Sequence, residues 1–137
     1  MFFEIMETPT VSSPSNYAEH REKYGYNQVL QVGNRIDIAG QGGWNKEIKF
    51  TYKNIEEEIM QAFDNVEHVL NSVGSSWKEV YSVTSYHVPL NEEATSLFPK
   101  LFKKYIGDRA PIWTCVGVSE LGEKEMHVEI VVTAYKS

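Results

Sequence analysis

The stretch IEEEIMQAFDNVEHVLNSVG, residues 55–74, carries the clearest structural pattern in the chain. Its apolar residues recur at steps of three and four, which places them along one face of a helix. They are Ile55, Ile59, Ala62, Phe63, Val66, Val69, Leu70 and Val73. Asn54 and Glu57 have the spacing of an N-cap and its first-turn partner, and Gly74 suits the helix end. The pattern predicts one long helix that buries a single face.

A second, shorter helical pattern follows later in the chain. Its apolar residues are Ala94, Leu97, Phe98, Leu101, Phe102 and Tyr105. Asn91 stands at the cap position and Gly107 at the stop. Pro99 interrupts the pattern because proline has no amide hydrogen to donate. We therefore expect either a kink or a helix that begins near Ser96.

The segments around these helices alternate apolar and polar residues, which is typical of strands. Residues 28–40, QVLQVGNRIDIAG, predict two strands joined by a tight Gly-Asn turn. Residues 79–88, 112–121 and 126–135 predict three more, with the sequence GEKE as the turn between the last two. The order is β-β-α-β-α-β-β, an α+β sheet with two helices on one face. We expect residues 1–20 to form an irregular N-terminal arm and residues 21–137 a single domain.

The last predicted strand indicates that the sheet has one open face. Val128, Ile130, Val132 and Ala134 alternate with a second set that is only partly polar, His127, Glu129, Val131 and Thr133. Two helices cover one side of such a sheet, and a partly apolar uncovered face is often buried by another subunit. The pattern therefore favours a homo-oligomer.

Composition excludes several classes of protein. The 137-residue chain has a formal net charge of -6, which argues against broad binding of nucleic acid. A single cysteine cannot form an internal disulfide, no apolar run is long enough for a membrane helix, and the first residues lack the basic region of a secretory signal. We expect a cytoplasmic protein without nucleic-acid or membrane partners.

The only cysteine lies in DRAPIWTCVGVSEL, residues 108–121, within an apolar run. A catalytic thiol needs a nearby histidine or helix N-terminus, so we interpret Cys115 as a packing and site-lining residue. The four histidines are too scattered for a metal-binding motif, and we expect no metal and no cofactor.

Glu129 is a stronger catalytic candidate because it lies in a strand between apolar neighbours. A carboxylate there can act as a general acid or base, or form a structural ion pair, and the sequence leaves both open. Tyr26 and Asn91 lie at element ends, although Asn91 is also a helix cap. The glycine-rich GQGGWN begins at Gly40, where another group can approach the backbone closely, and contains Trp44 at an unusual place for a core residue.

Four stretches together resemble the RidA/YjgF family, also called the L-PSP or reactive intermediate deaminase family. They are YNQVLQVGNRIDIAGQ, IEEEIMQAFDNVEHVLNSVGSSWKEVYSVTSYHVPLNE, RAPIWTCVGVSEL and VEIVVTAY. The resemblance implies a chorismate-mutase-like fold, and a homotrimer with a barrel-like core and a small-molecule cleft at each subunit interface. It also implies site roles for Tyr26, Asn91, Cys115 and Glu129, with Thr114 in contact with the ligand.

This chain departs from the family pattern at one position. Members that deaminate enamines and imines have an arginine two residues before the Ser/Thr-Cys pair, and Trp113 stands there. An indole has one N–H and no charge, so it cannot grip a carboxylate as a guanidinium does. Arg35 and Arg109 are the candidates for a replacement. An aromatic floor at Trp113, with Trp44 or Tyr26, would suit a less charged or bulkier ligand.

The resemblance implies a cofactor-independent hydrolase, similar to an enamine or imine deaminase but with an altered substrate, in which Glu129 is the general base or positions the water. The alternatives are a non-catalytic metabolite-binding or chaperone-like trimer and, disfavoured by the acidic balance, an endoribonuclease. Whether the protein is an enzyme stays open at this point.

Overall fold

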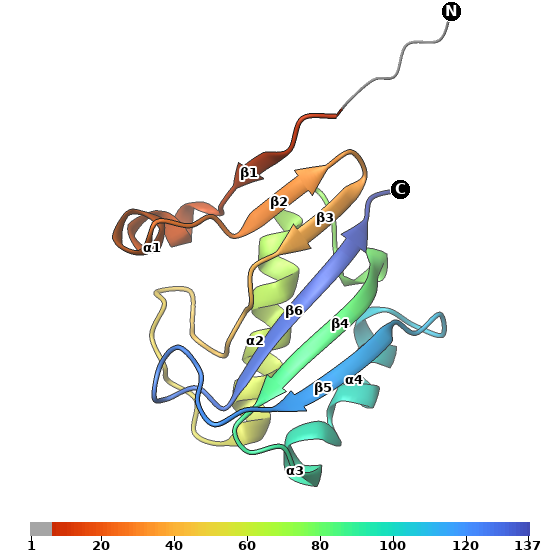
Figure 1. Cartoon of the computed structure of the whole chain (residues 1–137). Helices are drawn as coiled ribbons and strands as arrows, with labels where there is room; N and C mark the ends of the chain where they lie inside the picture. The colour runs from red at the N-terminus through yellow and green to blue at the C-terminus, as the bar shows by residue number, and fades with distance from the viewer. Residues whose placement is uncertain (1–6) are drawn as a thin grey trace, which may run out of the picture.

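A computed structural model describes residues 7–137 as one mixed sheet with its main helices on one side (Figure 1). The strands are β1 (Thr10–Ser12), β2 (Val29–Val32), β3 (Arg35–Ile38), β4 (Val80–His87), β5 (Ile112–Gly117) and β6 (Val128–Tyr135). The helices are α1 (Ala18–Tyr24), α2 (Ile55–Asn71), α3 (Glu92–Thr95) and α4 (Phe98–Tyr105), with short 3₁₀ turns η1 (Ser15–Tyr17) and η2 (Trp77–Glu79). This confirms the predicted α+β class and the two-layer arrangement.

The strand order in the sheet is β1-β2-β3-β6-β4-β5. All neighbours are antiparallel except β4 and β5, which run parallel because α3 and α4 connect them. GEKE does form a turn, in which the amide of Met126 donates to the carbonyl of Glu123, but the strands on either side of it are not neighbours, since β4 lies between β5 and β6. Residues 118–127 instead cross the end of β4, where the amide of Val118 donates to the carbonyl of His87.

The predicted arm is also wrong for the residues that the structure describes. Residues 10–12 form β1, which pairs with β2, and residues 15–24 form η1 and α1. Residues 1–6 lie outside the described part of the chain. The segment is held because the hydroxyl of buried Tyr17 donates to Gln41 and accepts from the indole N–H of Trp44. Proline and serine content alone did not indicate these long-range bonds.

Helix α2 agrees closely with its sequence pattern. Six of its apolar side chains are fully buried: Ile59, Ala62, Phe63, Val66, Val69 and Leu70. The side chain of Asn54 accepts from the amide of Glu57, whose own carboxylate accepts from the amide of Lys53. Gly74 follows the helix with a φ of 76°, a left-handed conformation that glycine adopts without strain.

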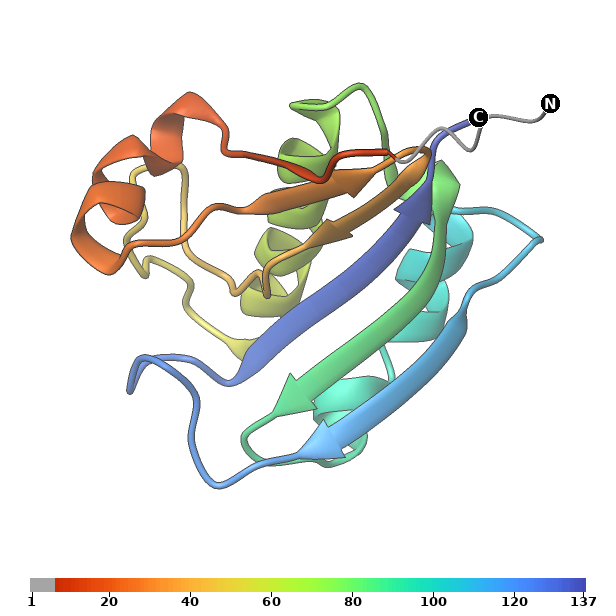
Figure 2. The same ribbon diagram turned by 45° about the horizontal axis from the view of Figure 1, so that its top comes forward.

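The second helical pattern is divided into two helices. Asn91 caps α3 by accepting from the amide of Ala94, and α4 begins at Phe98 with Pro99 in its first turn. Proline costs nothing there because first-turn amides have no partner within the helix. Together α2, α3 and α4 cover one face of the sheet, and Figure 2 shows the other face without a helix over its centre.

An aromatic cluster joins these helices to the sheet. The indole of Trp77 stacks on Phe63 at 4.6 Å between centroids, and its N–H donates to the carbonyl of Phe63. Phe98 and Phe102 complete the cluster against the same ring of Phe63. The predicted alternation of β6 is confirmed, because Val128, Ile130, Val132 and Ala134 are buried and the residues between them are half-buried. No helix among residues 7–137 is long and apolar enough to span a membrane.

Candidate functional site

The open face of the sheet holds Glu129 in a close fit against Gly40. A Cβ atom at Gly40 would lie 2.5 Å from Oε1 of Glu129, so only glycine leaves room for this side chain. Gln41 keeps the two residues together, since its backbone exchanges two hydrogen bonds with that of Ile130. Half-burial raises the pKa of the Glu129 carboxyl. The structure therefore provides a carboxyl group that takes up a proton more readily than an exposed glutamate.

Tyr26 lies near this carboxyl on the same side of the molecule. Its hydroxyl is 2.6 Å from Nε2 of His20 in α1. Burial is the main cause of its raised pKa, and the charge of Glu129 contributes to the same shift. His20 is a residue that sequence reasoning missed, because the helix that presents it was expected to be an irregular arm. The group formed by Glu129, Gly40, Tyr26 and His20 is the candidate site.

Strand β5 contributes to the two faces of the sheet differently. Thr114 pairs with Thr84, which pairs with Val131, so Thr114 shares the open face with Glu129. Since β4 lies between β5 and β6, the backbones of these two strands are separated by two strand spacings, or about 10 Å. Within one chain, only Thr114 of the Trp-Thr-Cys segment faces the side of the sheet that holds Glu129.

Trp113 and Cys115 point to the helix side of the sheet. The indole of Trp113 stacks on Phe98 at 5.3 Å with 4° between the planes, and its N–H donates to the hydroxyl of Ser85. Cys115 pairs with buried Ser85 in the parallel ladder but is itself exposed, because β5 is an edge strand. Within one chain Cys115 is therefore not a buried packing residue, and its site-lining role stays a prediction.

Two other predicted ligand contacts lie away from Glu129. Trp44 is only 8% exposed, and its indole packs against Phe50 and donates to Tyr17, so it is a core residue. Within the described chain Trp44 therefore does not extend an aromatic floor from Trp113, and the alternative of Trp113 with Tyr26 stays a prediction. Asn91 lines a separate cavity at the helix side of the sheet.

Neither candidate arginine reaches Glu129. Arg35 pairs with Asp37 at 3.0 Å, and the guanidinium of Arg109 lies 3.9 Å from the ring centre of Tyr81. Arg35 lies opposite Tyr135 in the β3–β6 ladder, six residues along β6 from Glu129, which is about 20 Å. Arg109 donates to the carbonyl of Val80, at the same far end of the sheet. The carboxylate-binding arginine of the resemblance thus has no replacement among the described residues near Glu129.

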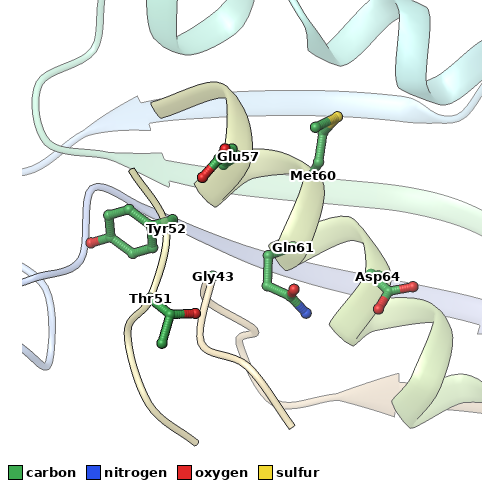
Figure 3. Close-up of a pocket in the computed structure, with 7 residues that line it drawn as sticks. All are labelled: Gly43, Thr51, Tyr52, Glu57, Met60, Gln61 and Asp64. Atoms are coloured by element: carbon green, nitrogen blue, oxygen red, sulfur yellow. The ribbon is translucent and has the colours of Figure 1, made fainter. Parts of the chain in front are cut away.

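The surface also has a pocket between α2 and the loop before it, which Glu129 does not line. This pocket has a volume of about 330 Å³. Figure 3 shows its lining, which consists of Gly43, Thr51 and Tyr52 from the preceding loops and Glu57, Met60, Gln61 and Asp64 from α2. None of the residues predicted from the sequence as site residues lines it. Within residues 7–137, no three histidine, cysteine or acidic side chains come together as metal ligands.

The amino-acid sequence of this chain matches a known protein family. A profile described as Endoribonuclease L-PSP matches residues 18–136. A RutC family protein of Pyrococcus abyssi is 32% identical over 112 residues, which cover 81% of this chain and 86% of the relative. A protein of Dermatophagoides farinae named 2-iminobutanoate/2-iminopropanoate deaminase is 31% identical over 109 residues, covering 77% and 80%.

Solved structures agree with the fold. The structure of protein YJGH is 26% identical with a TM-score of 0.72, and the match covers 96% of this chain and 98% of that one. The crystal structure of yeast Mmf1 is 22% identical with a TM-score of 0.76 over 95% and 100% of the two chains, which supports the fold alone. With the matching profile and sequence relatives, these observations show that the chain belongs to the Endoribonuclease L-PSP family, also called the RidA/YjgF family.

Proposed function

We propose that this protein hydrolyses the C=N bond of a small imine, or of the enamine in equilibrium with it, at a site centred on Glu129. The half-buried carboxyl of Glu129 against Gly40 is the observation that carries the proposal. The name of the D. farinae relative, an iminobutanoate and iminopropanoate deaminase, supports the reaction class. No step of this hydrolysis needs a cofactor.

Glu129 would act as the general base for the attacking water. Its carboxylate takes a proton from water as the oxygen bonds to the imine carbon, and the tetrahedral product then releases ammonia and leaves a carbonyl compound. The raised pKa suits this role because a base whose pKa is closer to neutrality holds the transferred proton better. Tyr26, held by His20, would orient the substrate nitrogen or the water.

Assembly into a homotrimer would complete the site. Trp113 and Cys115 lie on the opposite side of the sheet from Glu129, so one chain cannot place all three around one ligand. However, β5 is an edge strand, and a second copy could bring its β5 to the open face of the first. Apolar side chains exposed or half-exposed on that face, including Ile112, Val131 and Leu30, would be buried by such contact.

The proposed substrate differs from that of deaminases that grip a carboxylate. Trp113 donates its only N–H to Ser85, and Arg35 and Arg109 are bound at the far end of the sheet. We expect the preferred imine to carry an apolar or aromatic group in place of the carboxylate. The exposed free thiol of Cys115 suits a reducing compartment, and we propose a cytoplasmic location.

The first experiment compares Glu129→Gln with Glu120→Gln, a matched change at an exposed glutamate of the loop after β5. Ammonia release is measured with purified protein from a panel of imines with an unsubstituted nitrogen, generated in place by an amine oxidase from aliphatic and aromatic primary amines. We expect Glu129→Gln to lose about 10²–10⁴-fold in kcat/KM and Glu120→Gln to retain full activity. Equal activity of the two variants would contradict the proposal.

The second experiment asks what Trp113 determines. Trp113→Arg restores a guanidinium at the family position, and 2-aminoacrylate, which carries a carboxylate, is the test substrate. Gain of deamination would show that this residue sets the substrate class. Absence of any gain would mean that further differences separate the chain from carboxylate-binding members.

A second candidate function is a metabolite-binding trimer without turnover. It is favoured by Trp113, which stands where the deaminating members of the family have an arginine. It would be supported if no imine in the panel were hydrolysed while ligand binding persisted in Glu129→Gln. Endoribonuclease activity is disfavoured by the formal net charge of -6.

A further inference from the structure

A buried carboxylate and a histidine face each other on the helix side of the sheet. Glu58 of α2 has no exposed surface, yet both its oxygens are bonded to one residue. Oε2 accepts from the backbone amide of His127 at 2.7 Å, and Oε1 lies 2.8 Å from Nδ1 of the His127 ring. Residues 69 positions apart in the sequence are thus joined where the loop after β5 enters β6.

This geometry determines which ring nitrogen of His127 is free. A carboxylate oxygen only accepts, so Nδ1 carries the proton and donates it to Glu58. In the neutral ring Nε2 is then an unprotonated acceptor, on the opposite side of the ring from Glu58. A buried carboxylate that orients an imidazole in this way gives a positioned base, as in the acid–base pairs of hydrolases.

His127 also lines a cavity of about 240 Å³. The His127 side chain is 46% exposed, so its ring is reachable while Glu58 is not. Apolar side chains form much of the wall: Ile55, Val88, Pro89 and Ala94. The ring of Tyr52 meets His127 edge to face at 6.2 Å, and the same residue borders the pocket of Figure 3.

The charges around the cavity favour an uncharged occupant. Lys53 and Glu93 contribute one charge of each sign, and Glu58 is already bonded to His127. Burial and the charge of Glu58 raise the pKa of Tyr52 to about 12, so its hydroxyl stays neutral. The cavity therefore combines an apolar wall with the His127 imidazole and a few other polar side chains, among them Asn54 and Asn91, which suits a small and largely apolar molecule with one O–H group.

We propose that Glu58 and His127 form a second acid–base site, in which Nε2 of His127 binds and accepts the proton of a small alcohol or phenol. Transfer of that proton from a phenol leaves an imidazolium, whose Nδ1–H still donates to Glu58, and a phenolate held beside it, whereas an alcohol donates its O–H to Nε2 in a hydrogen bond. The site lies across the sheet from Glu129 and does not depend on imine hydrolysis.

Binding of phenol and of anisole to the full-length protein tests the acceptor. The two probes have similar apolar rings, but only phenol has an O–H to donate to Nε2. We expect saturable shifts of the His127 ring resonances in NMR titrations, with phenol binding about tenfold more tightly than anisole. In His127→Phe the two affinities should become equal. Equal affinities in the unchanged protein, or no saturable shift with either probe, would overturn the proposal.

The tautomer of His127 tests the role of Glu58 independently. Nitrogen-15 spectra of the neutral rings should show His127 protonated at Nδ1. His68, whose Nε2 lies 2.8 Å from the side-chain oxygen of Asn16, should show the other form. In Glu58→Gln the amide can donate to Nδ1, so the His127 proton should move to Nε2 and the preference for phenol should be lost, while His68 stays unchanged. Protonation of His127 at Nε2 in the unchanged protein would refute the assignment.

Discussion

Replacement of Gly40 by alanine tests how the chain holds Glu129. An added Cβ would lie 2.5 Å from Oε1, 2.6 Å from Cδ and 2.7 Å from Cγ of Glu129. Ordinary van der Waals contact begins at 3.4 Å. To relieve the contact at 2.5 Å, Oε1 of Glu129 and the new Cβ must move apart by about 0.9 Å. The carboxyl must yield because it ends a flexible side chain, whereas the backbone around residue 40 is bonded to β6 through Gln41.

We expect Gly40→Ala to lower the catalytic rate and to change the free energy of unfolding only slightly. A misplacement of about 1 Å can lower a catalytic rate about 100-fold. The free energy of unfolding should change by less than about 1 kcal/mol, since alanine also reduces the entropy of the unfolded chain. Movement of the carboxyl toward water should lower the pKa of Glu129 toward its ordinary value, because burial is the cause that raises it.

Three measurements on Gly40→Ala check this reasoning: urea unfolding, imine hydrolysis, and titration of the Glu129 carboxyl by carbon-13 NMR. Gly122→Ala is the matched control, because a Cβ there would meet nothing within 4 Å. We expect the control to match the unchanged protein in all three. A Gly40→Ala protein with normal turnover and an unchanged Glu129 titration would refute the proposed fit.

Four further predictions follow from the same structure. Burial raises the pKa of the Glu129 carboxyl in the folded state. The stability that this carboxyl contributes is therefore present below its unfolded-state pKa and is lost as pH rises through its folded-state pKa. Glu129→Gln should remove this pH dependence from the free energy of unfolding, measured in urea from about pH 4 to 8. Trp77→Ala should destabilise the chain by about 3–5 kcal/mol, because it empties the stack on Phe63, and Trp77→Phe should cost less. Asn54→Ala should cost about 1 kcal/mol through the lost cap of α2, and a cost near zero in thermal unfolding would contradict the capping role. Light scattering should give three times the chain mass of 15.7 kDa for the unchanged protein and a single chain mass for Val131→Lys, which places a charge on the open face.

Much of the fold could be predicted because its signals are local. The period of the apolar residues in 55–73 fixed which face of α2 is buried, and Asn54 and Gly74 marked its ends. Pro99 correctly indicated an interruption of the second helix. The turn at GEKE was predicted, but the two strands beside it are not neighbours, because pairing between strands depends on contacts outside the segment. The parallel partner of β5 is β4, reached through α3 and α4.

The candidate site was only partly predictable. Glu129 and Gly40 are far apart in the sequence but close in the structure. The strand pattern and the resemblance indicated Glu129, and the glycine-rich stretch indicated Gly40. Trp44 was assigned wrongly because a glycine-rich loop looks exposed, whereas the acceptor that binds its indole N–H is Tyr17. His20 and the Glu58–His127 pair were missed, since neither has a local spacing that signals a partner.

By itself the sequence determined the class of the fold, the buried face of each long element and the family, because apolar period, capping residues and short motifs are properties of neighbouring residues. Only the tertiary structure decided which strands are adjacent, that Trp113 and Cys115 face away from Glu129, and that Glu58 is bonded to His127. These are consequences of the β4–β5 crossover and of side-chain packing between segments far apart in the sequence, 69 positions for Glu58 and His127, and no local pattern encodes them.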